Sequence, residues 1–380
     1  MKKVIKTVAI NIAMGVIGGA VMAGVFIGLR NFGLGFIYRE DLDPVVEFLL
    51  LMGSVFLAMI LHTIIHELGH VVFGKLTGYE FLSYRIFSFS LQKTKQGYEI
   101  KRLSIPGTAG QALMKPPALV DGKMPYVWYN LGGVLFNLLL IIVSFGINVL
   151  CDHYVVRFIF TMSIGMGLFM GIINIFPYSE KGMTDGCNLL KLHRYPEKIK
   201  YLHLQLEMVA DLADGKCWEE FEIPEDLFDI EENEIDSFTF IPYLCGINKA
   251  YAEKDFKKAG EYIDVLYRNK KQLNKVHQYI FAAEKTFLEL IGENRKEIVD
   301  EAYTDEVKKF MKALKHEVSS WRVQMAYAYF YKHDSKKAME FYEKGMAAVK
   351  NAPYKGDAMM EVSILTYVKE RIEQQREEAV

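Results

Sequence analysis

The sequence predicts a mainly α-helical protein, in which a membrane bundle of about four transmembrane helices with a small β-hairpin precedes a soluble domain of helical repeats. Three observations support this fold class. Long uncharged apolar runs fill the first half of the 380-residue chain, whereas the second half is charged and rich in helix formers. In that second half, similar segments recur at nearly constant spacing, as in repeat proteins. We therefore divide the chain into a transmembrane domain (1–190), a linker helix with an acidic loop (191–237) and a helical-repeat domain (238–380).

Net charge and cysteine content argue against several classes of protein. A formal net charge of −2 argues against nucleic acid as the main partner. The four cysteines have no C-x-x-C spacing, which argues against a disulfide framework and against a cysteine-based zinc site. We expect buried or unused thiols in a reducing compartment at these positions, which are Cys151, Cys187, Cys217 and Cys245.

Four apolar runs are each long enough to cross about 30 Å of hydrocarbon. The first, residues 8–29, follows a basic tail and contains no charge. A cleaved signal peptide is the alternative for this run, although it is long for such a segment. The second run begins near residue 45 and continues through residue 70, and the others cover residues 126–150 and 155–176.

The distribution of Lys and Arg predicts the orientation of these spans. The N-terminal tail and the long loop between the second and third spans are basic, whereas the loops after the first and third spans are short and hold few basic residues. We expect a bacterial cell membrane, with the N-terminus, the long loop and the second half of the chain in the cytoplasm. The basic residues of the long loop are Lys75, Arg85, Lys93, Lys95, Lys101, Arg102, Lys115 and Lys123.

The long loop contains a predicted β-hairpin. Residues 79–90 and 98–105 are rich in β-formers and flank the polar segment 93–97, and residues 105–110 then break regular structure. An exposed edge of this hairpin could pair with an unwound substrate segment. The alternative is a hairpin that only caps the membrane domain.

The segment His66-Glu67-Leu68-Gly69-His70 contains an H-E-x-x-H motif. On a helix, positions i and i+4 share a face, so both imidazoles can reach one metal ion. Glu67 can then take a proton from a water at that metal. The motif is typical of zinc peptidases, and it lies at the expected cytoplasmic end of the second span.

Asp185 is the candidate third ligand of one zinc ion. Catalytic zinc usually has three protein ligands and a water. The fourth span ends at Asn174-Ile175-Phe176-Pro177, and Asp185-Gly186 follows on the expected side of His66 and His70. The alternative for the Asp-Gly pair is an ordinary turn.

Other polar residues inside the spans are costly and therefore candidates for function. Asn137, after the closely packing pair Gly132-Gly133, could hold a substrate carbonyl or an oxyanion, or only bond between helices. His62 lies one turn before His66, and we expect a packing or supporting role more than ligation. Asn174 could serve only the backbone groups left open by the following proline.

These residues resemble the site-2 protease family of intramembrane zinc metalloproteases. The family combines H-E-x-x-H on one helix, a G-x-x-x-N motif on the next, and N-x-x-P with a later D-G on a third. Here they occur in that order between about residues 45 and 190. The resemblance implies zinc on His66, His70 and Asp185, Glu67 as general base, and Asn137 as a holder of substrate or oxyanion. It also implies cleavage of membrane-embedded segments of signalling precursors or leftover signal peptides.

The chain departs from the family in the link before Asp185. Residues 178–184 form a longer and more polar link than the family usually has. Glu180 within this link is the alternative carboxylate, whereas Asp152 is expected on the opposite side of the membrane.

The soluble half is predicted to be helical. Residues 189–214 are predicted to form one helix leading out of the membrane. The acidic residues 218–236 are predicted to form a linker or surface loop, and the alternative for them is an acidic docking site. The segments 251–259 and 330–338 resemble each other, and 290–298 is a weaker copy. Such spacing resembles tetratricopeptide-type helical hairpins, which stack into a concave surface. This surface could bind a cytoplasmic regulator or a substrate tail, or the domain could only stabilise the protease.

Two functions from different classes are therefore open. The first is an intramembrane zinc endopeptidase that acts on membrane-embedded peptides or proteins, with the helical repeats recruiting a substrate or regulator. The second is a catalytically silent membrane anchor, whose repeats scaffold a partner in peptide export or immunity.

Overall fold

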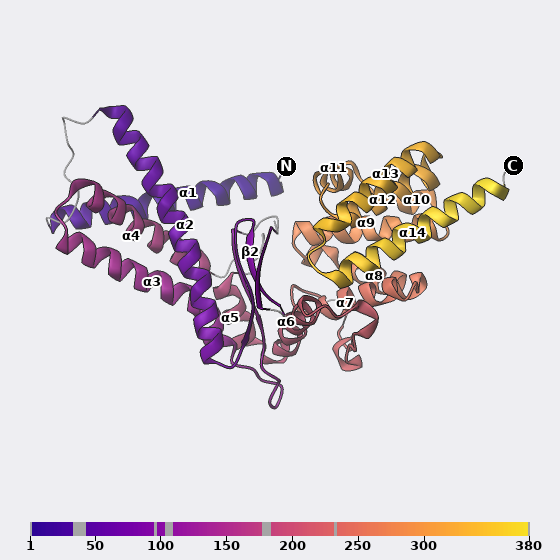
Figure 1. Ribbon diagram of the computed structural model, residues 1–380, viewed down its shortest axis with the longest axis horizontal. Helices are drawn as coiled ribbons and strands as arrows, with labels where there is room; N and C mark the ends of the chain where they lie inside the picture. The colour runs from indigo at the N-terminus through magenta and orange to yellow at the C-terminus, as the bar shows by residue number, and fades with distance from the viewer. Residues whose placement is uncertain are drawn as a thin grey trace.

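The computed structural model describes residues 2–32, 43–94, 97–102, 109–176, 184–231 and 234–378 (Figure 1). Helices dominate these ranges, and the remaining regular structure is a small antiparallel sheet, as the sequence predicts. The helices of the first half are α1 (Lys2–Asn31), α2 (Pro44–Leu76), α3 (Tyr126–Leu150) and α4 (Tyr154–Ile175).

Three of the helices in the described part of the chain, α2, α3 and α4, are long and apolar enough to cross a membrane. The bounds of α3 and α4 match the last two expected spans within one residue, whereas α2 starts one residue before the second expected span and continues six residues beyond it, to Leu76. The first expected span falls on α1, whose side chains are described only from Gly15 onward, so its crossing of a membrane stays a prediction. Asp43 starts α2 by accepting a hydrogen bond from the Val45 amide at 2.8 Å, with Pro44 in the first turn.

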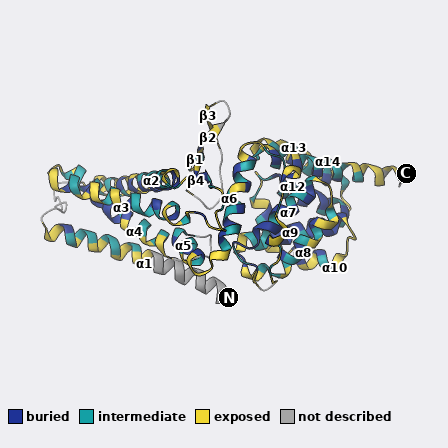
Figure 2. Cartoon of the chain, turned by 90° about the horizontal axis from the view of Figure 1, so that it is seen from below, coloured by how far each residue is buried: buried dark blue, intermediate teal, exposed yellow. Residues whose placement is uncertain are grey.

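The surface of these helices is apolar and their interior is partly polar. Leu49 on α2 and Ile142 on α3 are 62% and 60% exposed, whereas Ser54, Asn137 and other polar side chains are buried. Figure 2 shows the exposed residues running along the outer sides of α1 to α4. This distribution suits helices that contact lipid outside and pack through small and polar residues inside.

The sheet has four strands in the order β3-β2-β1-β4, all antiparallel. The predicted strand over residues 79–90 is wrong as a single element, because it divides at a turn where Phe87 has a φ of 51°. The strand β4 was not predicted, because its first residue, Gly110, belongs to a segment that was expected to interrupt regular secondary structure. The strands are β1 (Glu80–Ile86), β2 (Phe89–Thr94), β3 (Gly97–Arg102) and β4 (Gly110–Lys115).

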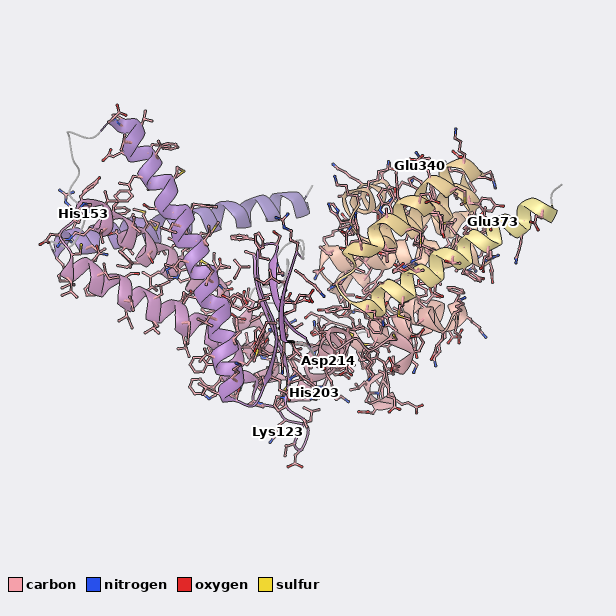
Figure 3. The ribbon with its side chains drawn as sticks, in the orientation of Figure 1. Lys123, His153, His203, Asp214, Glu340 and Glu373 are labelled. Carbon is pink, nitrogen blue, oxygen red and sulfur yellow. The ribbon has the colours of Figure 1, made fainter. Side chains whose placement is uncertain are left out.

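The sheet joins the two halves of the protein. Ala112 and Met114 of β4 pack with Val71 of α2, whereas Leu113 packs with Ala210 of α6 (Ile199–Ala213). The sheet and the second half lie at one end of α2, α3 and α4, and His153 in the connection between α3 and α4 lies at the other end (Figure 3).

The segment that leads into the second half differs from the prediction in two ways. The expected helix over residues 189–214 is broken into α5 (Asp185–Arg194) and α6 (Ile199–Ala213), because Pro196 cannot continue the hydrogen-bond ladder of α5. The acidic segment 218–236 lies at the surface with most of its described carboxylates exposed, but it is not a free linker. Four of its apolar residues are at most 4% exposed and anchor it to the helical core: Trp218, Phe221, Leu227 and Ile235.

The second half is a stack of helices around one continuous apolar core. The three predicted repeat segments fall on three similar turns, at Lys254, Asn294 and His333, each with a positive φ. Asp255 and Asp334 cap the helices after the first and third turns, whereas Arg295 leaves the second uncapped, so that copy is weaker. The helices are α7 (Ile241–Ala252), α8 (Phe256–Arg268), α9 (Lys275–Ile291), α10 (Lys296–Ala302), α11 (Asp305–Ala313), α12 (Val318–Ala326), α13 (Ser335–Ala348) and α14 (Lys355–Glu378).

A buried ionic cluster lies inside this helical stack. The Arg322 guanidinium, 1% exposed, donates to Glu284 at 3.0 and 3.1 Å and to Glu361 at 2.9 and 3.2 Å. The Tyr251 hydroxyl donates to Glu284 at 2.6 Å. These bonds join α7, α9, α12 and α14, so the cluster fixes how the repeats stack.

Candidate metal centre

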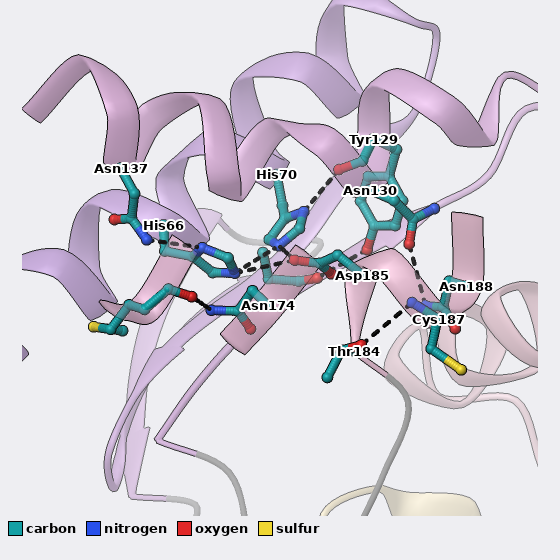
Figure 4. Close-up of polar contacts among 12 residues, drawn as sticks. His66, His70, Tyr129, Asn130, Asn137, Asn174, Thr184, Asp185, Cys187 and Asn188 are labelled. Carbon is teal, nitrogen blue, oxygen red and sulfur yellow. Dashed lines mark hydrogen bonds and ion pairs between the residues drawn. The ribbon is translucent and has the colours of Figure 1, made fainter. Parts of the chain in front are cut away.

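Three donor atoms converge where α2, α3, α4 and α5 meet (Figure 4). His66 and His70 lie one turn apart on α2, and Asp185 is the first residue of α5. The Nε2 atoms of the two histidines are 3.2 Å apart, and Asp185 Oδ2 lies 3.3 Å from the first and 3.6 Å from the second. The structure therefore brings together all three ligands that the sequence predicts.

The donor atoms have the spacing that a zinc ion requires. A tetrahedral zinc with bonds of about 2.0 to 2.1 Å holds its ligand atoms about 3.3 to 3.4 Å apart. Asp185 Oδ2 is buried and makes no hydrogen bond to any described residue, although a buried carboxylate oxygen normally needs a partner. A cation between the three atoms would satisfy it, so the residues present fit zinc.

A hydrogen bond of the Nδ1 atom fixes the tautomer and the orientation of the His70 ring. It lies 2.7 Å from the backbone carbonyl oxygen of Tyr129 on α3. A carbonyl only accepts, so Nδ1 carries the proton and Nε2 keeps its lone pair for a metal. Tyr129 was not identified from the sequence, because any residue at this position would supply the same carbonyl.

Asp185 reaches the histidines although residues 178–184 form a long link. The Thr184 hydroxyl donates to the Phe176 carbonyl at 2.7 Å and accepts from the Cys187 amide at 3.2 Å. A Cβ on Gly186 would lie 1.8 Å from the carbonyl oxygen of Ile175. The end of α4 and the start of α5 are thus held together directly, whatever path the link takes. Glu180, the alternative carboxylate, lies outside the described residues.

Glycines allow the ligands to lie this close to the neighbouring helix. A Cβ on Gly133 would lie 2.4 Å from Cε1 of His66, and a Cβ on Gly69 would lie 2.1 Å from the Gly132 carbonyl oxygen. The prediction that Gly132 and Gly133 permit close helix contact is confirmed. Any side chain at these positions would push α3 away from the metal centre.

Asn137 contacts histidines at both ends of its amide. Its Nδ2 lies 3.2 Å from Nδ1 of His66, and its Oδ1 lies 3.1 Å from Nδ1 of His62. Of the two roles expected for Asn137, this geometry favours bonding between helices over contact with a substrate. His62 Nε2 lies 2.8 Å from the Ser163 carbonyl oxygen, so His62 is a neighbour of the centre and not a ligand.

Glu67 lies beside the edge strand β4. A Cβ on Gly110 would lie 2.7 Å from Oε1 of Glu67, so the carboxylate lies directly against the backbone of this strand. The buried Arg85 also reaches Gly110, donating to its carbonyl at 3.4 Å. Burial lowers the pKa of the Arg85 guanidinium, and the charge of Glu67 opposes this shift. The sequence identified Arg85 only as a loop charge, because nothing local indicates its burial.

The remaining candidates lie apart from the donor atoms. Asn174 donates to the Met170 carbonyl of its own helix at 2.9 Å, which is a backbone contact but not the carbonyl that the following proline would leave open. Asp152 is exposed and pairs with Arg157 in the connection between α3 and α4.

Comparison with known proteins adds no match. No family model, no curated protein and no solved structure matches the chain.

Proposed function

We propose that this protein is an intramembrane zinc metalloendopeptidase that cleaves membrane-embedded peptides or proteins. The observation that carries the proposal is the convergence of His66, His70 and Asp185 within an apolar helix bundle, with Glu67 adjoining the ligands. One zinc ion is the implied cofactor. The resemblance to the site-2 protease family points to the same chemistry.

The residues of the centre have different roles in peptide hydrolysis. Zinc, when bound, lowers the pKa of a water towards about 7 and polarises the scissile carbonyl. Glu67 takes the proton of that water and delivers it to the leaving amine. His70 and Asp185 are held by Tyr129 and by Thr184 with Gly186, so the donor atoms need little rearrangement when substrate binds.

The strand β4 is our candidate for presenting the substrate. It pairs with β1 on one side, and no described strand pairs with its other side. A substrate helix has its carbonyls in hydrogen bonds and must unwind before it is cut. An extended substrate segment lying along β4 would pass Gly110 and therefore Glu67.

We further propose that the centre, the sheet and the helical domain face the cytoplasm of a bacterial cell. The metal centre lies at the end of α2 that carries the sheet, away from the connection between α3 and α4. The helical domain then meets the cytoplasmic part of a substrate or a regulator before cleavage.

Substitution of the general base tests this function. Glu67→Gln should bind zinc normally but leave membrane substrates uncut, so that they accumulate and can be captured with the variant. Glu47→Gln, near the other end of the same helix, is the matched control and should retain activity. The proposal fails if cells with Glu67→Gln contain the same cleaved membrane-protein fragments, in the same amounts, as cells with the wild type. Purified wild type without near-stoichiometric zinc, in chelator-free buffers, would favour the silent anchor.

A further inference from the structure

A chain of hydrogen bonds runs from α4 through α2 and α3 to the candidate ligand His66. Its members are the Ser163 carbonyl, His62, Asn137 and His66, with successive distances of 2.8, 3.1 and 3.2 Å. We propose that His62 is a positioning residue. Acting through Asn137, it fixes the tautomer of His66 that offers a bare Nε2 to the metal. The inference rests on the proposed zinc centre and identifies what orients one of its ligands.

The chain begins at a group whose role is fixed. The Ser163 carbonyl can only accept, so His62 Nε2 must carry a proton and donate to it. A neutral imidazole has one N–H group, so Nδ1 of His62 is then an acceptor. His62 is completely buried, and its Cε1 lies close to Gly167, where an added Cβ would be 2.4 Å away. The bond to the Ser163 carbonyl keeps Nε2 towards α4, so the acceptor Nδ1 faces Asn137.

The acceptor of His62 decides how the Asn137 amide is oriented. The two ends of an amide are equal in size, so the site admits either orientation and the hydrogen bonds choose between them. In the structure the amide oxygen of Asn137 faces Nδ1 of His62 at 3.1 Å, and the amide nitrogen faces Nδ1 of His66 at 3.2 Å. This orientation sets two acceptors against each other at His62, or requires a charged His62 in the buried interior. Turned over in place, Asn137 donates from its NH2 group to His62 and presents its oxygen to His66, and we assign this orientation.

The oriented amide in turn fixes His66. With the amide turned over in this way, Nδ1 of His66 donates to the amide oxygen, so Nε2 keeps its lone pair, which faces Nε2 of His70 and Oδ2 of Asp185. The two histidine ligands thus reach the same state by different routes. His70 donates directly to a backbone carbonyl, whereas His66 depends on an amide that His62 has oriented.

A double-mutant cycle separates this role from simple packing. His62→Leu should lower the Co²⁺ and Zn²⁺ affinity of the full-length protein about 10- to 100-fold, the usual effect of losing a partner of a ligand. His62→Gln should restore most of the affinity, because its oxygen can accept from Asn137 while its NH2 group donates to Ser163. In the Asn137→Asp background, a carboxylate accepts from His66 without needing orientation. There, adding His62→Leu should change the affinity within about 2-fold.

The outcomes distinguish this inference from the proposed function. An equal loss of affinity in both backgrounds, or no loss in a folded His62→Leu protein, overturns the role of His62 while leaving the zinc centre. A wild type that binds neither metal overturns the zinc centre itself. If His62→Leu does not fold, ¹⁵N-histidine NMR of the metal-free wild type decides. The proton should lie on Nε2 of His62 and on Nδ1 of His66, and a proton on Nε2 of His66 would overturn the inference.

Discussion

The backbones of Gly69 on α2 and Gly132 on α3 touch: a Cβ on Gly69 would lie 2.1 Å from the carbonyl oxygen of Gly132, and a Cβ on Gly132 would lie 2.4 Å from that of Gly69. Gly69 lies directly before His70, and Gly132 directly before Gly133, which faces the ring of His66. The distance between the two helices therefore sets the position of both histidines of the candidate metal centre.

Gly69→Ala should separate α2 from α3 and damage the metal centre. The obstacle is backbone, which cannot move aside as a flexible side chain can, so we expect a loss of at least about 1 to 3 kcal/mol and a marked loss of bound zinc. Gly53→Ala, on the same helix with no atom within 4 Å of the added Cβ, should stay within about 0.5 kcal/mol of the wild type. Thermal unfolding in detergent and zinc analysis measure both, and an unaltered Gly69→Ala protein would contradict this packing.

Gly186→Ala should displace Asp185 while leaving the helix bundle folded. The added Cβ would lie 1.8 Å from the Ile175 carbonyl oxygen, so the start of α5 must shift and carry the neighbouring carboxylate away from the histidines. We expect a zinc affinity at least about 10-fold lower, comparable to the loss of a ligand's partner. Gly171→Ala on α4, where the added Cβ meets no atom within 4 Å, is the matched control. Equal zinc affinity of the two variants would show that α5 adapts freely.

Asp185→Asn should lower zinc affinity more than any change around the ligands. Removing a residue that hydrogen-bonds to a metal ligand usually lowers metal affinity about 10- to 100-fold. We therefore expect the zinc affinity to fall more than about 100-fold when a ligand itself is removed. Competition with a chromophoric chelator measures it. Asp152→Asn, in the exposed connection between α3 and α4, should bind zinc like the wild type. If Asp185→Asn also binds normally, another carboxylate, with Glu180 as the first candidate, holds the metal.

Arg322→Met should destabilise the helical domain far more than the loss of a surface ion pair. It would leave the carboxylates of Glu284 and Glu361 buried without their cation, which costs about 3 to 5 kcal/mol. Lys337→Met removes an exposed pair with Glu340 and should cost less than about 1 kcal/mol. Urea unfolding of the full-length protein, followed by circular dichroism, compares the two. Similar midpoints would mean that water reaches the buried cluster.

Asp357→Asn should make the protein less sensitive to pH. Burial raises the pKa of Asp357 to about 6, assisted by the charges of Glu361 and Glu317 and opposed by a hydrogen bond from Trp218. The folded state therefore holds this proton more tightly than the unfolded state, and stability falls as pH rises from about 4 to about 6. Asparagine keeps the acceptor for the Trp218 indole without the charge.

The variant should therefore be more stable than the wild type above pH 6, by about 3 kcal/mol at most, and similar to it near pH 4. Melting temperatures of the full-length protein across this pH range measure the difference. A constant difference between the two proteins at all pH values would contradict the raised pKa.

Part of the fold was determined by the sequence itself. The bounds of α3 and α4 and the start of α2 follow from apolar runs interrupted by charges and turn residues, since a run of that length has few other stable states than a helix in lipid. The turns at Lys254 and His333 were recognisable because each precedes an aspartate that caps the next helix. The four main residues of the candidate centre, His66, Glu67, His70 and Asp185, were identified because a local motif and a helix end carry them.

Only the tertiary structure decided how these residues meet. That the long link still lets Asp185 reach the histidines depends on the contact of Gly186 with Ile175, which no local pattern encodes. The packing of the acidic segment depends on apolar anchors such as Trp218 finding a distant core. The contacts that join His66, Asn137 and His62 to a carbonyl of α4 likewise connect distant segments. Each of these is a contact between segments far apart in the chain, where close packing and the matching of donors with acceptors decide the outcome.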